Sequence, residues 1–279
     1  MSDKTLYDLN MDALFECFMS NSLNINKKAE NGKYLFAPGI LNLIIRPECN
    51  QQCEYCYIYK YGDQLYPKEK RVDNATLLKN LKLLLEYLDT IHCYFKRIEL
   101  YAGDLFYDDL FFDIVDILYD YYIELKKRDI VDFNREFIDI IIPTNFSFCN
   151  HPDKIEKFSQ YFEKFRSHGL KLLLSYSGDG PYATDIREKK EITDEFYHTV
   201  FSLIKKYNFG CHPMISVESI KSLKKNYDWW LEQCKKYDLF TFQPMLLEVR
   251  NGNWTDEAIA DYMDALTYMF NKRLAMCDN

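Results

Sequence analysis

The sequence predicts an α/β fold in which six strand–helix units form a partial (β/α)6 barrel with parallel strands. Short apolar runs rich in branched residues alternate six times with amphipathic stretches of helical period. Such an alternation favours parallel pairing and right-handed crossovers. Hydrophobic residues make up 48% of the 279 residues, which is enough for a packed core. Because eight units complete a TIM barrel, six units predict an incomplete, TIM-like one.

The elements are expected in a regular order. A short N-terminal helix at about 7–19 and a polar linker precede a first strand at 40–45. The helix after the first strand can be capped by Asp73 or Asn74, whose side chains can accept from its unpaired amides. Later strands are expected at 97–101, 137–142, 170–176, 211–217 and 239–246, and later helices at 108–127, 152–165, 193–207, 223–236 and 255–273. The expected regions are an N-terminal helical extension and linker at 1–34, the partial barrel at 35–250, and a C-terminal helix at 251–279.

Charge and composition disfavour several classes of partner. The formal net charge is −8, and Lys and Arg are spread among acidic residues, whereas nucleic-acid binders present a basic patch. No apolar run reaches the length of a membrane span, and the polar start at 1–4 does not look like a secretory signal. We therefore expect a cytoplasmic protein with no nucleic-acid or membrane partner. Nine cysteines, an odd count without such a signal, argue against a disulfide framework.

Three of the cysteines form a cluster directly after the first expected strand. Cys49, Cys53 and Cys56 have the spacing C-x3-C-x2-C. Structural zinc takes four ligands, usually as two separated pairs, and an electron-transfer iron–sulfur cluster takes four cysteines. No fourth ligand is evident near this loop. Three thiolates leave one metal position open, where a substrate or a cofactor can bind.

The loop resembles the signature of the radical S-adenosylmethionine (radical SAM) superfamily. The resemblance lies in the three cysteines and in the aromatic Tyr55 before the third. With Tyr57 it also resembles the C-x-Y-C-Y variant of peptide-modifying members, the SPASM-type and anaerobic sulfatase-maturase-like enzymes. The resemblance implies one 4Fe–4S cluster on three cysteines and S-adenosyl-L-methionine on the fourth iron. It also implies a 5′-deoxyadenosyl radical that abstracts hydrogen from substrate, and a reductant such as flavodoxin or ferredoxin.

A short turn after the second expected strand supports the resemblance. Ala102, Gly103 and Asp104 stand where the superfamily carries a Gly-Gly-Glu stretch that receives the amino group of S-adenosylmethionine. An aspartate is one methylene shorter than a glutamate and can still accept from an ammonium group. An ordinary Gly-Asp turn is the alternative interpretation.

The third and fourth strands end in further motifs of this kind. Thr144 and Asn145 resemble the Thr-Asn-Gly of the superfamily, with Phe146 in place of the glycine. The turn 177–181 resembles Ser-x-Asp-Gly-Pro, whose serine, here Ser177, reaches the ribose of the cofactor. Ser175 is an alternative to Ser177, because the strand register is open.

Arg187 is the last expected cofactor-binding residue. With Asp185 it resembles a His-Asp-x-x-Arg element whose arginine pairs with the cofactor carboxylate, although the spacing here is shorter and the histidine is absent. A guanidinium group matches two carboxylate oxygens in geometry. A turn with surface charges is the other interpretation of Asp185.

Three functions remain open from the sequence. The substrate of the radical chemistry is either a peptide or protein side chain, or a small metabolite or nucleotide. The third possibility is a non-catalytic iron–sulfur or zinc protein on the same fold. The peptide-modifying relatives often carry a cysteine-rich C-terminal extension with auxiliary clusters, whereas here a single helix and Cys277 are expected after the sixth strand. No general base or other catalytic side chain is evident.

Overall fold

The computed structural model describes residues 27–53, 56–101, 103–133, 137–182, 192–211, 213–239, 245–246 and 254–277. The expected N-terminal helix lies outside these residues. The division into three regions stays a prediction.

The described strands are parallel. The main sheet has the order β1-β2-β3-β4-β5, and β6 pairs with β7 in a separate two-stranded sheet. This confirms the predicted α/β class with parallel strands. The strands are β1 (Leu41–Ile44), β2 (Arg97–Tyr101), β3 (Ile138–Thr144), β4 (Leu170–Tyr176), β5 (Gly210–Cys211), β6 (Met214–Ile215) and β7 (Met245–Leu246).

The expected fifth strand is divided in the structure. It was predicted at 211–217, but β5 ends at Cys211 and β6 begins at Met214 in the other sheet. Pro213 lies between them and has no amide hydrogen to donate to a strand ladder. The break therefore moves the end of the predicted strand away from the main sheet.

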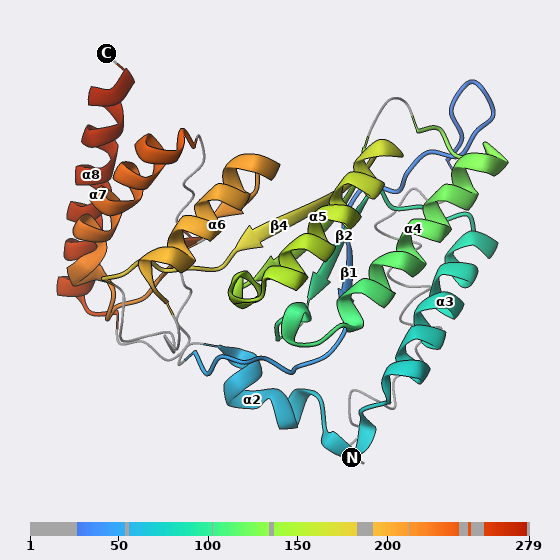
Figure 1. Cartoon of the computed structure of the whole chain (residues 1–279), viewed down its shortest axis with the longest axis horizontal. Coiled ribbons are helices and arrows are strands. Elements are labelled where there is room, and N and C mark those ends of the chain that lie inside the picture. Colours follow the sequence, from blue (N-terminus) through green and yellow to red (C-terminus); the bar gives the residue numbers. More distant parts are fainter. Residues whose placement is uncertain are drawn as a thin grey trace.

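Helices cover the sheet and extend beyond it. Figure 1 shows α3, α4, α5 and α6 along one side of the sheet, α2 beyond the ends of the strands, and α7 beside α8 at the other end of the molecule. The helices are α2 (Tyr57–Leu65), α3 (Asn74–Thr90), α4 (Leu110–Arg128), α5 (Pro152–Ser167), α6 (Asp194–Tyr207), α7 (Ile220–Tyr237) and α8 (Asp256–Cys277). None of the helices described is both long and apolar enough to cross a bilayer.

Local sequence explains why the long helices begin where they do. The Asp73 carboxylate accepts from the Thr76 amide at 2.7 Å and caps α3. The Thr193 hydroxyl accepts from the Phe196 amide at 3.1 Å and caps α6. Each bond satisfies one of the amides that a helix start leaves unpaired. The predicted cap of α3 at Asp73 is therefore confirmed.

The core lies between the sheet and its helices. Residues of β3 alternate between buried and half-buried, so one face of the strand packs against helices while the other stays partly open. Aromatic rings fill much of this layer, and Phe111, Phe158, Phe165 and Phe201 have no exposed surface. A second apolar cluster joins β6 and α7 to α8; it contains Ile215, Ile220, Leu223, Tyr227, Ala265 and Met269.

Helix α2 directly follows the third cysteine and was not expected. Its nine-residue segment is rich in tyrosine, and its apolar residues at helical spacing, Ile58, Tyr61 and Leu65, are too few to predict a helix by themselves. Gly62 is its one buried residue, and Tyr57, Tyr59 and Leu65 are each more than 40% exposed. Contacts beyond its own sequence must therefore hold α2 in place.

Candidate functional site

The cysteine loop rests on the turn that follows β2. The Gly103 amide donates to the Arg46 carbonyl at 2.9 Å, and the Asp104 amide donates to the Glu48 carbonyl at 2.8 Å. A Cβ atom on Gly103 would overlap the Glu48 carbonyl and lie 2.5 Å from the carbonyl oxygen of Pro47. The residue must therefore be glycine, because the backbone of the loop lies directly against it.

The Asp104 carboxylate is buried at the centre of this edge, with 1% of the residue exposed. It accepts from the Phe106 amide at 2.9 Å, the Asn145 amide at 2.9 Å and the Thr144 hydroxyl at 3.0 Å. Burial raises the pKa of this carboxyl, although these hydrogen bonds and Lys154 act in the opposite direction. Asp104 thus joins the carboxyl ends of β2 and β3.

Asn145 extends this connection to the cysteine loop. Its side-chain nitrogen donates to the Asn50 side-chain oxygen at 2.8 Å and lies 3.8 Å from the Cys49 sulfur. The next residue, Phe146, has a φ of 61° and a ψ of 18°, the left-handed conformation that glycine adopts at low cost. The backbone at position 146 therefore keeps a conformation that suits glycine, although the residue here is phenylalanine.

The three cysteines differ in their surroundings. Cys53 is buried, Cys49 and Cys56 are partly exposed, and the Gln51 amide donates to the Cys49 sulfur at 3.3 Å. The pKa of Cys49 is raised to about 12, mainly by burial; Asp104, Cys53 and Cys56 also raise it, while the Gln51 bond lowers it. Over the described ranges, no three His, Cys, Asp or Glu side chains already form a group that could hold a metal ion. The loop therefore brings thiols into one region without converging them on one point.

The turn after β4 packs on α7. The Asp179 carboxylate accepts from the Met214 amide at 2.9 Å, and the Asn226 side chain accepts from the Tyr182 amide at 3.0 Å. Gly180 has a φ of 89°, and a Cβ atom there would lie 2.7 Å from the Asn226 oxygen. The Ser177 amide donates to the Thr144 carbonyl at 2.8 Å, so this turn also connects to the end of β3.

A cavity of about 380 Å³ lies between the cysteine loop and α2. Its walls include Cys49 and Cys56 together with Glu48, Asp63 and Arg71. The cavity therefore lies beside two of the thiols and is also lined by charged side chains.

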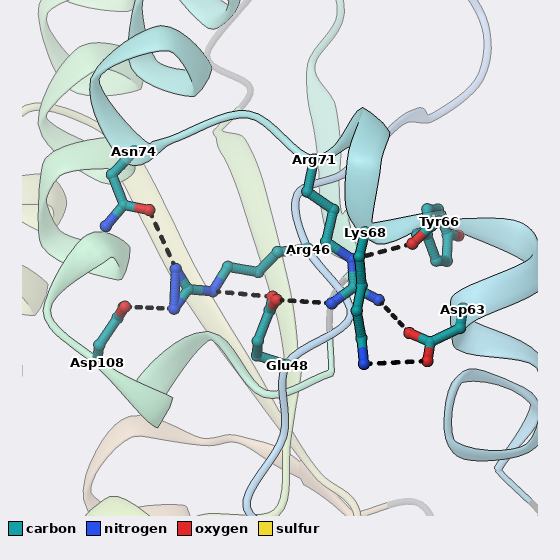
Figure 2. Close-up of polar contacts among 8 residues, drawn as sticks. All are labelled: Arg46, Glu48, Asp63, Tyr66, Lys68, Arg71, Asn74 and Asp108. Carbon is teal, nitrogen blue, oxygen red and sulfur yellow. Dashed lines mark hydrogen bonds and ion pairs between the residues drawn. The ribbon is translucent and has the colours of Figure 1, made fainter.

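Glu48, Asp63 and Arg71, which line this cavity, belong to a longer chain of charged side chains (Figure 2). Glu48 pairs with Arg71 at 3.3 Å and with Arg46 at 3.5 Å. Arg46 continues to Asp108 and to the Asn74 side-chain oxygen, the latter at 3.2 Å. On the other side, Arg71 reaches Asp63, which also pairs with Lys68.

The predicted site residues are brought together in part. Cys49, Cys53 and Cys56 share one loop, and Gly103 and Asp104 contact its backbone. Ser177 follows β4 and contacts the end of the neighbouring strand β3 through the Thr144 carbonyl. Tyr55, Ala102, Asp185 and Arg187 lie outside the described residues.

Two features of the site were missed in the sequence. The contact of Asn145 with the cysteine loop depends on strand order. The Arg46–Glu48–Arg71 chain depends on where α2 ends. The charged residues that precede Cys49 in the motif were the only local sign of the second feature.

Comparisons with known proteins concern the fold. No protein-family model and no curated protein matches the sequence. Among solved structures, it is similar to native anSMEcpe with bound AdoMet and Cp18Cys peptide, at 17% identity and a TM-score of 0.54 over 85% of this chain. It is also similar to hexahistidine-tagged anSMEcpe with bound AdoMet, at 16% identity and a TM-score of 0.52 over 82% of this chain.

The anSME proteins are anaerobic sulfatase-maturating enzymes of the radical SAM type. This chain covers 62% and 59% of the length of the two structures, about three fifths. The likeness shows that the chain shares the fold of these two solved structures over most of its own length.

Proposed function

We propose that the chain is a radical SAM enzyme in which Cys49, Cys53 and Cys56 hold one 4Fe–4S cluster and S-adenosylmethionine occupies the open position. The observation that carries the proposal is the place of the three thiols. They lie on one loop at the carboxyl end of β1, against the turn after β2, in a fold similar to that of anSMEcpe. Chemistry in such folds is built at this edge of the sheet.

The donor set fits an iron–sulfur cluster with one open iron. Three thiols in one loop suit three irons and leave the fourth without a protein ligand. The Gln51 amide and the Asn145 side chain lie where they can donate to the Cys49 sulfur, and such bonds act against the burial that raises its pKa. Assembly of the cluster requires the three thiols to converge further than they do in the structure.

The cluster, when bound, supplies the electron that splits S-adenosylmethionine and so produces a radical able to abstract hydrogen from substrate. The chain orients the reactants. A carboxylate can accept about four hydrogen bonds. Three donors among the described residues reach Asp104, and we assign its remaining acceptor position to the cofactor ammonium. We assign Ser177 to the ribose and Arg187 to the cofactor carboxylate, with Tyr55, Ala102 and Gly103 lining the same site.

A peptide or protein side chain is the substrate class that we propose. The C-x-Y-C-Y form of the loop supports this choice, and so does the likeness to anSMEcpe, which is bound to Cp18Cys peptide in one structure. A small reductant protein such as flavodoxin or ferredoxin would supply electrons in the cytoplasm.

The proposal is tested on the full chain, reconstituted anaerobically with iron and sulfide. Dithionite and S-adenosylmethionine are added, and 5′-deoxyadenosine is measured. Wild-type protein should form the nucleoside, and Cys53→Ala should form none. Cys93→Ala is the matched control, because Cys93 is a buried cysteine remote in sequence from the loop, on the segment before β2.

Other outcomes separate the competing functions. A wild-type protein that takes up zinc and assembles no iron–sulfur chromophore would contradict the proposal. A cluster without any nucleoside, even with substrate peptides present, would support a non-catalytic iron–sulfur protein. Nucleoside formation stimulated by small metabolites and not by peptides would overturn the proposed substrate class.

A further inference from the structure

Helix α2 directly follows the last ligand of the proposed cluster but has little packing of its own. Cys56 is the N-cap residue directly before α2, and its side chain makes no capping bond. The helix has nine residues, one of which is buried, and its first turn has no acidic residue to complement the helix dipole. So short a helix is marginal unless tertiary contacts hold it.

Arg71 supplies such contacts at the far end of α2. Its Nη2 pairs with the Asp63 carboxylate at 2.8 Å, and its Nε donates to the Tyr66 carbonyl at 2.9 Å. Asp63 lies within α2, and Tyr66 is the C-cap residue directly after its last residue, Leu65. The Arg71 guanidinium group thus binds both a side chain of α2 and the backbone at its C-terminal end.

Glu48 connects Arg71 to the other arm of the cysteine loop. Its Oε1 lies 3.3 Å from Arg71 Nη1, and its Oε2 lies 3.5 Å from Arg46 Nε. Figure 2 shows Glu48 between the two arginines, with α2 on one side and the Asn74 and Asp108 side chains on the other. A single carboxylate therefore joins both halves of the network.

The backbone at Arg46 and Glu48 is held as well. The carbonyls of these two residues accept from Gly103 and Asp104 at 2.9 and 2.8 Å. Their main chain therefore fixes the loop to the end of β2, while their side chains reach the helices. Glu48 is the point at which the sheet edge and α2 are joined, one residue before Cys49.

We propose that Glu48 and Arg71 are positioning residues that hold Cys49 and Cys56 at a set separation by tying the start of the cysteine loop to α2. This inference rests on the proposed function, because it concerns the loop that would hold the cluster. Neither side chain is required to contact substrate or cofactor. Their role is to limit the movement of α2 relative to the loop, so that the thiols stay poised for iron.

The charges of the network provide a second way to test the positioning role. Arg46, Arg71 and Lys68 face Glu48, Asp63 and Asp108, so the six groups balance. The Arg46 and Arg71 side chains are only 15% and 28% exposed, which limits screening by water. Loss of Glu48 leaves an excess positive charge beside the thiols, and loss of Arg71 leaves an excess negative charge.

The first measurement uses the reconstituted full chain. Iron release to a chelator should be about fivefold faster in Glu48→Gln and in Arg71→Gln than in wild type, as expected for the loss of a partly buried ion pair. The midpoint potential of the cluster should rise in Glu48→Gln and fall in Arg71→Gln, because a nearby positive charge favours the reduced state. Arg71→Lys keeps the positive charge but loses the several N–H donors of the guanidinium group. This variant should therefore release iron faster than wild type, while the midpoint potential of its cluster stays near the wild-type value.

Lys68→Gln is the matched control. Lys68 pairs with Asp63 at 3.3 Å in the same network, but its side chain is 73% exposed. Its iron release and potential should equal those of wild type. Iron release at the wild-type rate in both Glu48→Gln and Arg71→Gln would overturn the inference, and so would equal effects in Lys68→Gln.

A second measurement does not depend on the cluster. Hydrogen exchange of the α2 amides in iron-free protein should be faster in Glu48→Gln and Arg71→Gln and unchanged in Lys68→Gln. Unchanged exchange in all three variants would refute the positioning role. A wild-type protein that assembles no cluster would refute the proposed function instead, so the two failures are distinct.

Discussion

The Asp104 carboxylate accepts a hydrogen bond from the backbone nitrogen of Asn145 at 2.9 Å, and this bond joins the ends of two neighbouring parallel strands. The same oxygen accepts from Thr144, and the other accepts from Phe106. A buried carboxylate thus organises the edge of the sheet on which the cysteine loop rests.

Asp104→Ala should lower the free energy of unfolding by about 2–4 kcal/mol, because it leaves buried donors without an acceptor. Urea denaturation measures the change. Asp109→Ala is the control, since Asp109 is an exposed carboxylate nearby that makes no side-chain capping bond. Equal losses in the two variants would contradict the role assigned to Asp104.

Gly103→Ala should push the cysteine loop away from β2, because the new Cβ atom would overlap the Glu48 carbonyl. We expect a loss of about 1–3 kcal/mol in stability, and lower iron content after reconstitution.

Gly62→Ala is the matched control for this substitution. Gly62 lies in α2, and its Cβ atom would meet Ile58 at 3.7 Å and Pro47 at 4.0 Å, both ordinary contacts. Alanine should stabilise that helix by about 0.5–1 kcal/mol. A Gly103→Ala protein with wild-type stability and iron content would show that the loop does not need this close approach.

Phe146→Gly should destabilise the protein by about 2–4 kcal/mol. Phe146 has no exposed surface and packs on Phe148 and Tyr176, at ring distances of 5.3 and 5.2 Å. Loss of a buried phenyl ring costs about 3–5 kcal/mol, and relief of the left-handed backbone returns about 1 kcal/mol.

Phe146→Ala separates the two effects. It loses the same ring but keeps the strained conformation, so it should be about 1 kcal/mol less stable than Phe146→Gly. Thermal or urea unfolding of both variants provides the comparison. An alanine variant as stable as the glycine variant would mean that the backbone at 146 carries no such cost.

Asp89→Asn should change how stability depends on pH. Arg128 donates to both oxygens of Asp89 at 2.8 Å, and Tyr94 donates to one of them at 2.8 Å. The hydrogen bonds from Arg128 are the main cause of the lowered pKa of this carboxyl. A carboxyl with a lowered pKa stabilises the fold above its unfolded pKa, and this contribution disappears as the pH falls through the folded value.

The variant should therefore be about 1 kcal/mol less stable at pH 7, a modest figure because the Arg128 side chain is 37% exposed. The difference from wild type should vanish below the folded pKa of Asp89. Urea titrations at several pH values measure it. Glu86→Gln, an exposed change on the same helix, should shift stability by less than about 0.5 kcal/mol at every pH. A difference between Asp89→Asn and wild type that persists in acid would contradict the ion-pair explanation.

Several elements could be read from local pattern alone. The strands at 97–101 and 170–176 lie where the sequence predicted them, and Asp73 caps α3 as expected. Periodicity and capping depend on residues a few positions apart, so a single stretch of sequence contains the information. The spacing of Cys49, Cys53 and Cys56 is local in the same sense, and it carried the functional hypothesis.

Other features depend on residues that are distant in sequence. Helix α2 is short, has one buried residue and is held by Arg71 through Asp63 and Tyr66. Asp104 meets Asn145 only because β2 lies beside β3 in the sheet.

By itself, the sequence determined the α/β order of the supporting elements and the cysteine spacing of the loop on which the proposed chemistry rests. The tertiary structure alone decided which polar groups surround that loop: the shared carboxylate of Glu48, the amide of Asn145 and the backbone over Gly103. The physical reason is that hydrogen bonds and ion pairs of this kind form between groups that only the folded chain brings within about 3–4 Å of one another.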